Sequence, residues 1–133
     1  MTTVVKIKVN DSVIADLLCS AWEGGSNYWA RANNTPYTWT ETNGNRGLLS
    51  LKDSFLSNGL TITDMEENDS GKKHLLSICK CRRALQIMAE KYPWHFMDAM
   101  YYQDDDKYGR GNPDATTGDV FLQCAIFGEI VYG

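Results

Sequence analysis

The stretch DSVIADLLCSAWEGGSNYW, residues 11–29, carries the clearest structural pattern in the chain. Its apolar side chains recur every three or four positions, as they do on one face of an amphipathic helix. The residues of this face are Val13, Ile14, Leu17, Leu18, Ala21 and Trp22. Asn10 or Asp11 can cap the start of the helix, and Gly24-Gly25 can end it, because a residue without Cβ enters the left-handed conformation at low cost. The pattern therefore predicts a helix with one buried face.

Two large aromatic residues, Tyr28 and Trp29, follow the glycines almost directly, and their position allows two interpretations. The rings can fold back onto the helix, since aromatic side chains usually serve the core. Alternatively, they form an exposed recognition platform together with Asn27 and Arg31, near Tyr37 and Trp39 of the next strand. Such a group supplies stacking faces, an amide and a guanidinium. It would suit a nucleotide base or a hot spot for a partner protein.

Three further polar residues are candidates for the same surface. Glu23 lies in the last turn of the predicted helix, beside its negative end, so it either pairs with a cation such as Arg31 or contacts a ligand. Asp119 and Gln123 stand one turn apart in an apolar segment near the end of the sequence. They can form a half-buried helix edge, or they can face Tyr28 and complete a polar-lined pocket.

Alternating apolar and polar residues predict several strands. Residues 4–9 alternate in this way, which is typical of a strand with one solvent face, and so do residues 37–40. Residues 43–45 have turn chemistry, and residues 48–57 could form a short helix or a loop. Residues 60–77 contain two strand-like runs around a polar, glycine-containing turn, which predicts an antiparallel hairpin.

Helical periodicity returns in the second half of the chain. Ser77 can cap a second helix that ends near Lys91, and residues 94–102 form a short helix with Phe96, Met97, Met100 and Tyr101 on one face. A last helix can start at Asp114 or Thr116. Between these two helices, the charged, glycine-containing and proline-containing run 104–113 is typical of a surface loop.

The order of these elements predicts the fold class. A strand, a helix, a strand, a hairpin and then three helices indicate an α+β protein, with a small antiparallel sheet covered on one face by helices. The composition is that of a globular protein, with 43% hydrophobic and 11% aromatic residues. No repeat or linker divides the 133 residues, and a chain of this length normally builds one core. We therefore expect a single domain over residues 1–133.

Composition also bears on the compartment and the partners. The start, MTTVVKIKVNDS, lacks the apolar run of a signal peptide, and no segment approaches the roughly 20 apolar residues of a membrane span, so a cytoplasmic location is expected. The net charge is −4, and an acidic cluster at 64–69 immediately precedes a basic one at 72–91. The negative field of the acidic cluster repels phosphate, which disfavours binding to nucleic acids.

No complete catalytic or metal-binding motif is present. His95 and Asp98 form the best helical pair, which could be an oriented general base or an ordinary surface hydrogen bond. Cys79 and Cys81 form a bare C-x-C, and a structural zinc site needs four ligands. All four cysteines lie in apolar periodic segments, which favours reduced thiols in the core without disulfides. We expect no catalytic residue, no metal and no cofactor.

Three stretches resemble a family of small, functionally uncharacterised proteins common in tailed-phage and prophage genomes. They are DLLCSAWEGGSNYW at 16–29, MAEKYPWHFMDAM at 88–100 and DATTGDVFLQCAIFGEIVYG at 114–133. The resemblance implies a viral accessory protein of the host bacterial cytoplasm. The family carries no established activity, so it assigns no role to any residue.

Small phage proteins without catalytic motifs often act by binding. We therefore expect a counter-defence or host-takeover protein that occludes a host defence complex or sequesters a nucleotide signal. One alternative is an enzyme acting on a nucleotide or small metabolite, with His95, Asp98, Glu23 or Asp119 in a cleft, and another is a virion assembly partner. The apolar end, Ile130–Gly133, should either return to the sheet or meet a second copy, and a homodimer is favoured.

Overall fold

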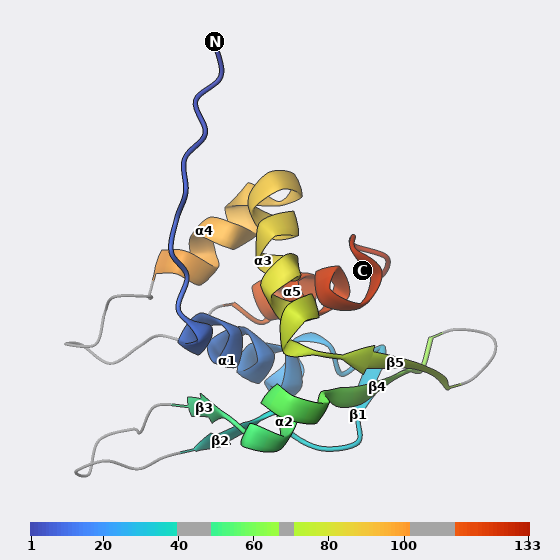
Figure 1. The fold of residues 1–133 in the computed structure, drawn as a ribbon. Helices are drawn as coiled ribbons and strands as arrows, with labels where there is room; N and C mark the ends of the chain where they lie inside the picture. The colour runs from blue at the N-terminus through green and yellow to red at the C-terminus, as the bar shows by residue number, and fades with distance from the viewer. Residues whose placement is uncertain (40–48, 67–70, 102–113) are drawn as a thin grey trace.

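Helices make up most of the described chain, and its strands form two small antiparallel sheets. The computed structural model describes residues 1–39, 49–66, 71–101 and 114–133. Within these ranges there are five α-helices, a three-stranded sheet and a two-stranded sheet. Helices α1, α3, α4 and α5 lie together on one side of the strands (Figure 1). The predicted α+β class is confirmed.

The first helix follows the predicted pattern. Helix α1 spans Asp11–Ser20 and continues into a π-helical turn, η1, at Ala21–Gly25. Its apolar face is buried, from Val13 to Ala21. Gly24 ends the helical path with a φ of 156°, a backbone conformation that residues with a side chain rarely adopt.

Helix α5, Ala115–Phe127, is the central element of the core and packs against α1, η1 and α3. It approaches the first helix so closely that glycine is needed at the contact. A Cβ on Gly118 would lie 2.7 Å from the Ala21 nitrogen and 2.7 Å from the Ser20 Cβ. A Cβ on Gly25 would collide with the Ala115 carbonyl oxygen. These two glycines therefore bring α5 directly against α1 and η1.

The larger sheet has the strand order β1-β4-β5, with both pairs antiparallel. Its strands are β1 at Ala30–Ala32, β4 at Leu60–Asp64 and β5 at Lys72–Leu76. Strands β4 and β5 confirm the predicted hairpin. The smaller sheet pairs β2, Tyr37–Trp39, with β3, Leu49–Leu51, and α2 follows at Asp53–Asn58. Residues 48–57, expected as a short helix or loop, thus contain both a strand and a helix.

The later helices also begin where the sequence predicts. Helix α3, Ile78–Lys91, is capped by the Ser77 hydroxyl, which accepts a hydrogen bond from the Lys80 backbone N–H at 3.2 Å. Helix α4 spans Pro93–Tyr101. Its predicted apolar face is only partly correct, because Met97 and Tyr101 are exposed. The carboxylate of Asp114 caps α5 by accepting from the Thr116 N–H.

The predicted strand at residues 4–9 is wrong. This segment has no assigned secondary structure, and it runs along the helices away from both sheets (Figure 1). Val4 is 84% exposed, and Val5 and Ile7 are exposed too. The reason is that an extended segment becomes a strand only beside another backbone, and none of the described strands pairs with it. The turn at 43–45 and the loop at 104–113 lie outside the described residues.

No helix in the described ranges is long and apolar enough to span a membrane. The cysteines are free; Cys19, Cys81 and Cys124 are buried as expected, whereas Cys79 is exposed on the first turn of α3. Burial raises the pKa of the Cys81 thiol to about 12 and that of Cys19 and Cys124 to about 11. The three buried thiols therefore stay protonated at neutral pH.

In the native protein, we expect Cys79 to be the one thiol of the four that reacts rapidly with Ellman's reagent, because the thiolate is the reactive species and the other three thiols are buried and protonated. Unfolding in urea should make all four thiols accessible to the reagent. The variant Cys79→Ser should lose the fast native phase and keep the three slow thiols. A fast phase that survives in this variant would contradict the placement of the cysteines.

Candidate functional site

A buried carboxylate ties the loop after η1 to helix α5. Asp119 is 8% exposed, and its two oxygens accept four hydrogen bonds. Its Oδ1 accepts from the Ser26 hydroxyl and from the Trp29 indole N–H, both at 2.7 Å. Its Oδ2 accepts from the Tyr28 hydroxyl at 2.7 Å and from the Gln123 amide at 3.0 Å. Loop residues 26–29 are therefore held in position by one charge on α5.

Gln123 extends this network to the end of the chain. Its amide oxygen accepts from the backbone N–H groups of Val131, at 2.7 Å, and Tyr132, at 2.8 Å. Its amide nitrogen donates to the Tyr132 carbonyl as well as to Asp119. The Tyr132 hydroxyl then donates to Asp64 on β4 at 2.7 Å. The apolar end thus returns to the sheet, as one of the two sequence interpretations predicted.

Trp29 is not part of an exposed platform, and that prediction is wrong. Its side chain is 0% exposed and lies against the rings of Phe127 and Tyr132, with centroid separations of 5.3 and 5.5 Å. Tyr28 remains 46% exposed, but its hydroxyl is bound to Asp119. Partial burial, and then the hydrogen bond to Asp119, raise the pKa of Tyr28. Because both donors converge on a buried carboxylate, they are not available to a ligand.

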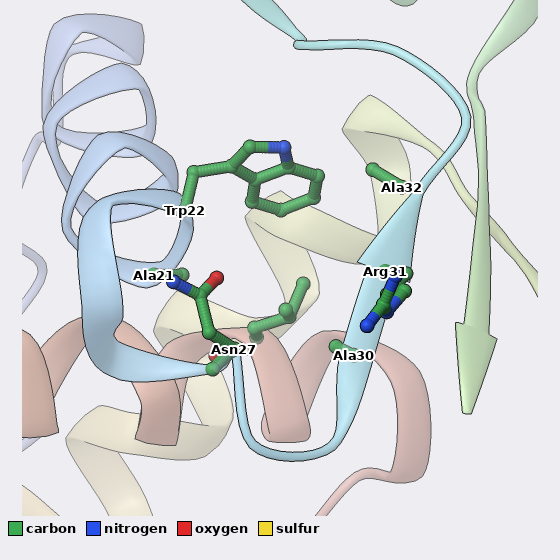
Figure 2. A pocket seen from close by; sticks show the side chains of 8 residues that line it. Ala21, Trp22, Asn27, Ala30, Arg31 and Ala32 are labelled. Carbon is green, nitrogen blue, oxygen red and sulfur yellow. The ribbon is translucent and has the colours of Figure 1, made fainter. Parts of the chain in front are cut away.

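A cavity of about 350 Å³ lies next to this loop, between η1 and the edge strand β1 (Figure 2). Trp22 from η1 faces β1 across it, and Asn27 projects from the loop below. The strand side is formed by residues 30–32, and Ser26 contributes to the wall while its hydroxyl binds Asp119. The network of Asp119 therefore forms the support behind the cavity.

Three polar groups around this cavity have no partner in the described part of the chain. The Trp22 indole N–H, the Asn27 amide and the Arg31 guanidinium make no hydrogen bond or ion pair there. Trp22 is half-buried, and Asn27 and Arg31 are exposed. An indole face stacks on planar rings and on cations, an amide both donates and accepts, and a guanidinium binds phosphate or carboxylate. All three groups are free to contact a ligand.

Only part of the predicted set of site residues meets at this cavity. Asn27 and Arg31 line it, whereas Asp119 and Gln123 support it from the core. Among the described residues, Glu23 forms no ion pair with Arg31 and does not line the cavity; its carboxylate helps to raise the pKa of the Cys19 thiol.

Trp39 is 50% exposed and lies on the smaller sheet, away from the residues that line the cavity. The residue that sequence reasoning missed is Trp22, which was assigned to the buried helix face. The π-helical turn at Ala21–Gly25 contains an additional residue per turn, and Trp22 within it is half-buried, packs against the core and also lines the cavity. The available signal was the diglycine that begins two residues after it.

The candidate catalytic pair does not form. His95 Nδ1 lies 3.0 Å from the Thr117 hydroxyl, and Asp98 accepts from the Asp114 backbone N–H at 3.2 Å. Both side chains therefore form hydrogen bonds with residues at the N-terminal end of α5. Among the residues that the structure describes, no three His, Cys, Asp or Glu side chains lie close enough to hold a metal ion.

Comparison of the chain with protein-family models, with curated proteins and with solved structures finds no match. The likeness to small phage proteins stays a prediction. The stretches that carry it contribute η1 and α5, most of α4, and parts of α1 and α3, and these helices pack on one another. Function must therefore be inferred from the cavity and its support.

We expect Asp119→Asn to destabilise the protein by about 2–4 kcal/mol, since an amide nitrogen would then face two buried or half-buried donors. Urea unfolding followed by circular dichroism measures the change. The matched control is Glu129→Gln, which removes a negative charge from an exposed residue just beyond the same helix. If both variants lose equally little stability, Asp119 does not hold the loop.

Proposed function

We propose that this protein acts by binding a small, planar, negatively charged ligand of the nucleotide class in the cavity between η1 and β1. The observation that carries the proposal is the meeting on one cavity of three groups without a partner among the described residues: the Trp22 indole, the Asn27 amide and the Arg31 guanidinium. A nucleotide needs a stacking surface for its base and a cation for its phosphate. The two sides of this cavity offer both.

The size and charge of the cavity limit the kind of ligand that it can hold. A volume of about 350 Å³ lies at the lower end of the roughly 300–1,000 Å³ of small-molecule sites, which suits one nucleotide better than an oligonucleotide. Among the described residues that line it, Arg31 is the only cationic one. A single guanidinium matches one phosphate or phosphodiester better than the charge of a triphosphate.

The support behind the cavity favours binding as well. Ser26 and Asn27 stand on a loop whose position is set by three hydrogen bonds to Asp119, from Ser26, Tyr28 and Trp29. A site whose walls are already ordered loses little conformational entropy when a ligand enters.

Binding is favoured over turnover because the residues that the sequence offers for catalysis do not line the cavity. The hydrogen bonds of His95 and Asp98 go to the start of α5, and the carboxylate of Asp119 is engaged in the network. The proposed setting is that of a phage accessory protein that sequesters a nucleotide signal. Occlusion of a host complex, virion assembly and a homodimer stay predictions from the sequence.

The ligand site can be tested by isothermal titration calorimetry with nucleoside monophosphates and cyclic dinucleotides. We expect Trp22→Leu and Arg31→Gln each to weaken binding about tenfold or more, through lost stacking and lost charge pairing. The matched controls are Trp94→Leu and Arg83→Gln, which change an exposed tryptophan and an exposed arginine on other helices. Equal losses in the control variants, or no binding by the parent protein, would refute the site.

The proposed setting can be tested in bacteria that carry a defence system triggered by a nucleotide signal. Expression of the parent protein should raise the plating efficiency of a phage that this system restricts. Trp22→Leu should abolish the effect while accumulating to the same level, because leucine removes the stacking ring and keeps an apolar side chain where Trp22 packs against the core. Protection by Trp22→Leu equal to that of the parent would show that any counter-defence activity does not use this cavity.

A further inference from the structure

Strand β1 presents a free edge to the cavity. It is an outer strand of the larger sheet, and β4 is its only partner among the strands that the structure describes. The Asn33 N–H donates to the Thr61 carbonyl, and the Met65 N–H donates to the Trp29 carbonyl. In an antiparallel ladder, alternate residues face the partner strand. Residues 29, 31 and 33 therefore turn their backbone groups to β4, and Ala30 and Ala32 turn theirs to the opposite, open edge.

One of the backbone groups on this edge is already used. The Ala30 N–H donates to the Ser26 carbonyl at 2.9 Å. The Ala30 carbonyl and the N–H and carbonyl of Ala32 have no partner among the described residues. Both alanines line the cavity, and Figure 2 shows them on the strand opposite Trp22. Because their side chains are single methyl groups, a flat ring can reach the backbone itself.

We infer that this edge reads the base of the ligand, and that the base is adenine. The inference rests on the proposed nucleotide site. Along the strand, the edge offers an acceptor, a donor and a second acceptor: the Ala30 carbonyl, the Ala32 N–H and the Ala32 carbonyl. Adenine presents its N6 amino donor beside the ring acceptor N1, followed by a weakly donating C2–H. This order is complementary to the edge.

The other bases match this edge less well. Cytosine also places an amino donor beside a ring acceptor, but its next group is the O2 acceptor, which would face the Ala32 carbonyl. Guanine and uracil carry a ring N–H where the Ala32 N–H needs an acceptor. An unpaired or opposed polar group of this kind costs affinity because the ligand loses its hydrogen bonds to water without replacing them.

The test compares ligands on the parent protein by calorimetry. We expect adenosine 5′-monophosphate to bind about tenfold or more tightly than the guanosine, cytidine and uridine monophosphates. Purine riboside 5′-monophosphate, which lacks the N6 amino group, should lose a similar factor. Binding of all these nucleotides with equal affinity, together with weaker binding by Trp22→Leu, would overturn the adenine inference and leave the proposed function standing. If none of these nucleotides binds, both the adenine inference and the proposed function are refuted.

A backbone variant tests the edge directly. Ala32→Pro deletes the N–H that faces the cavity, and an edge strand tolerates proline where this group is outside the ladder. We expect it to weaken binding of adenosine 5′-monophosphate about tenfold, whereas the control Ala32→Ser, which keeps the N–H, should bind like the parent. Equal affinities in the two variants would overturn the inference. If Ala32→Pro does not fold, as judged by its melting curve, the ligand series decides alone.

Discussion

The carboxylate of Asp119 is the constraint on which the rest of this structure depends. A charge that is 8% exposed is costly unless it is paired or fully hydrogen-bonded, and here it accepts four donors. Three of these donors come from loop residues 26–29 and one from Gln123. Since Trp29 is followed directly by β1, the carboxylate also determines where the sheet edge begins. Electrostatics, together with apolar packing, therefore positions this strand against the helices.

The same network separates structural polar groups from those that can serve a ligand. Inside it, the hydroxyls of Ser26 and Tyr28 and the indole of Trp29 are all satisfied by Asp119. Outside it, on the cavity next to the same loop, Trp22 and Arg31 have no partner in the described ranges. Polar groups left unpaired around a cavity, beside others that are fully paired, are a reason to expect a binding site there.

Sequence patterns predicted the parts of the fold that depend on local order. The period of 11–22 falls on α1 and the start of η1, which continues it, and the periods of 78–91 and 115–127 each fall on one helix; all three helices form. A strand depends on a distant neighbour, so the alternation at residues 4–9 was not sufficient. Local sequence also did not predict which of the two tryptophans would line the cavity. Trp29 is held in the core by its hydrogen bond to Asp119, which is 90 residues away, and Trp22 lies in the π-helical turn. From the sequence, contact between Asp119 and the loop after the diglycine was only one of two interpretations of Asp119.

The length of β1 bears on which kind of ligand its edge can hold. An open strand edge is usually a site for adding another strand, which needs several alternate residues with both backbone groups free. Strand β1 has three residues, its Ala30 N–H is occupied by Ser26, and the chain bends after Ala32. A peptide would gain few hydrogen bonds there. A flat ring needs only two or three, and it can use the Trp22 face at the same time. The short edge therefore favours a base over a strand.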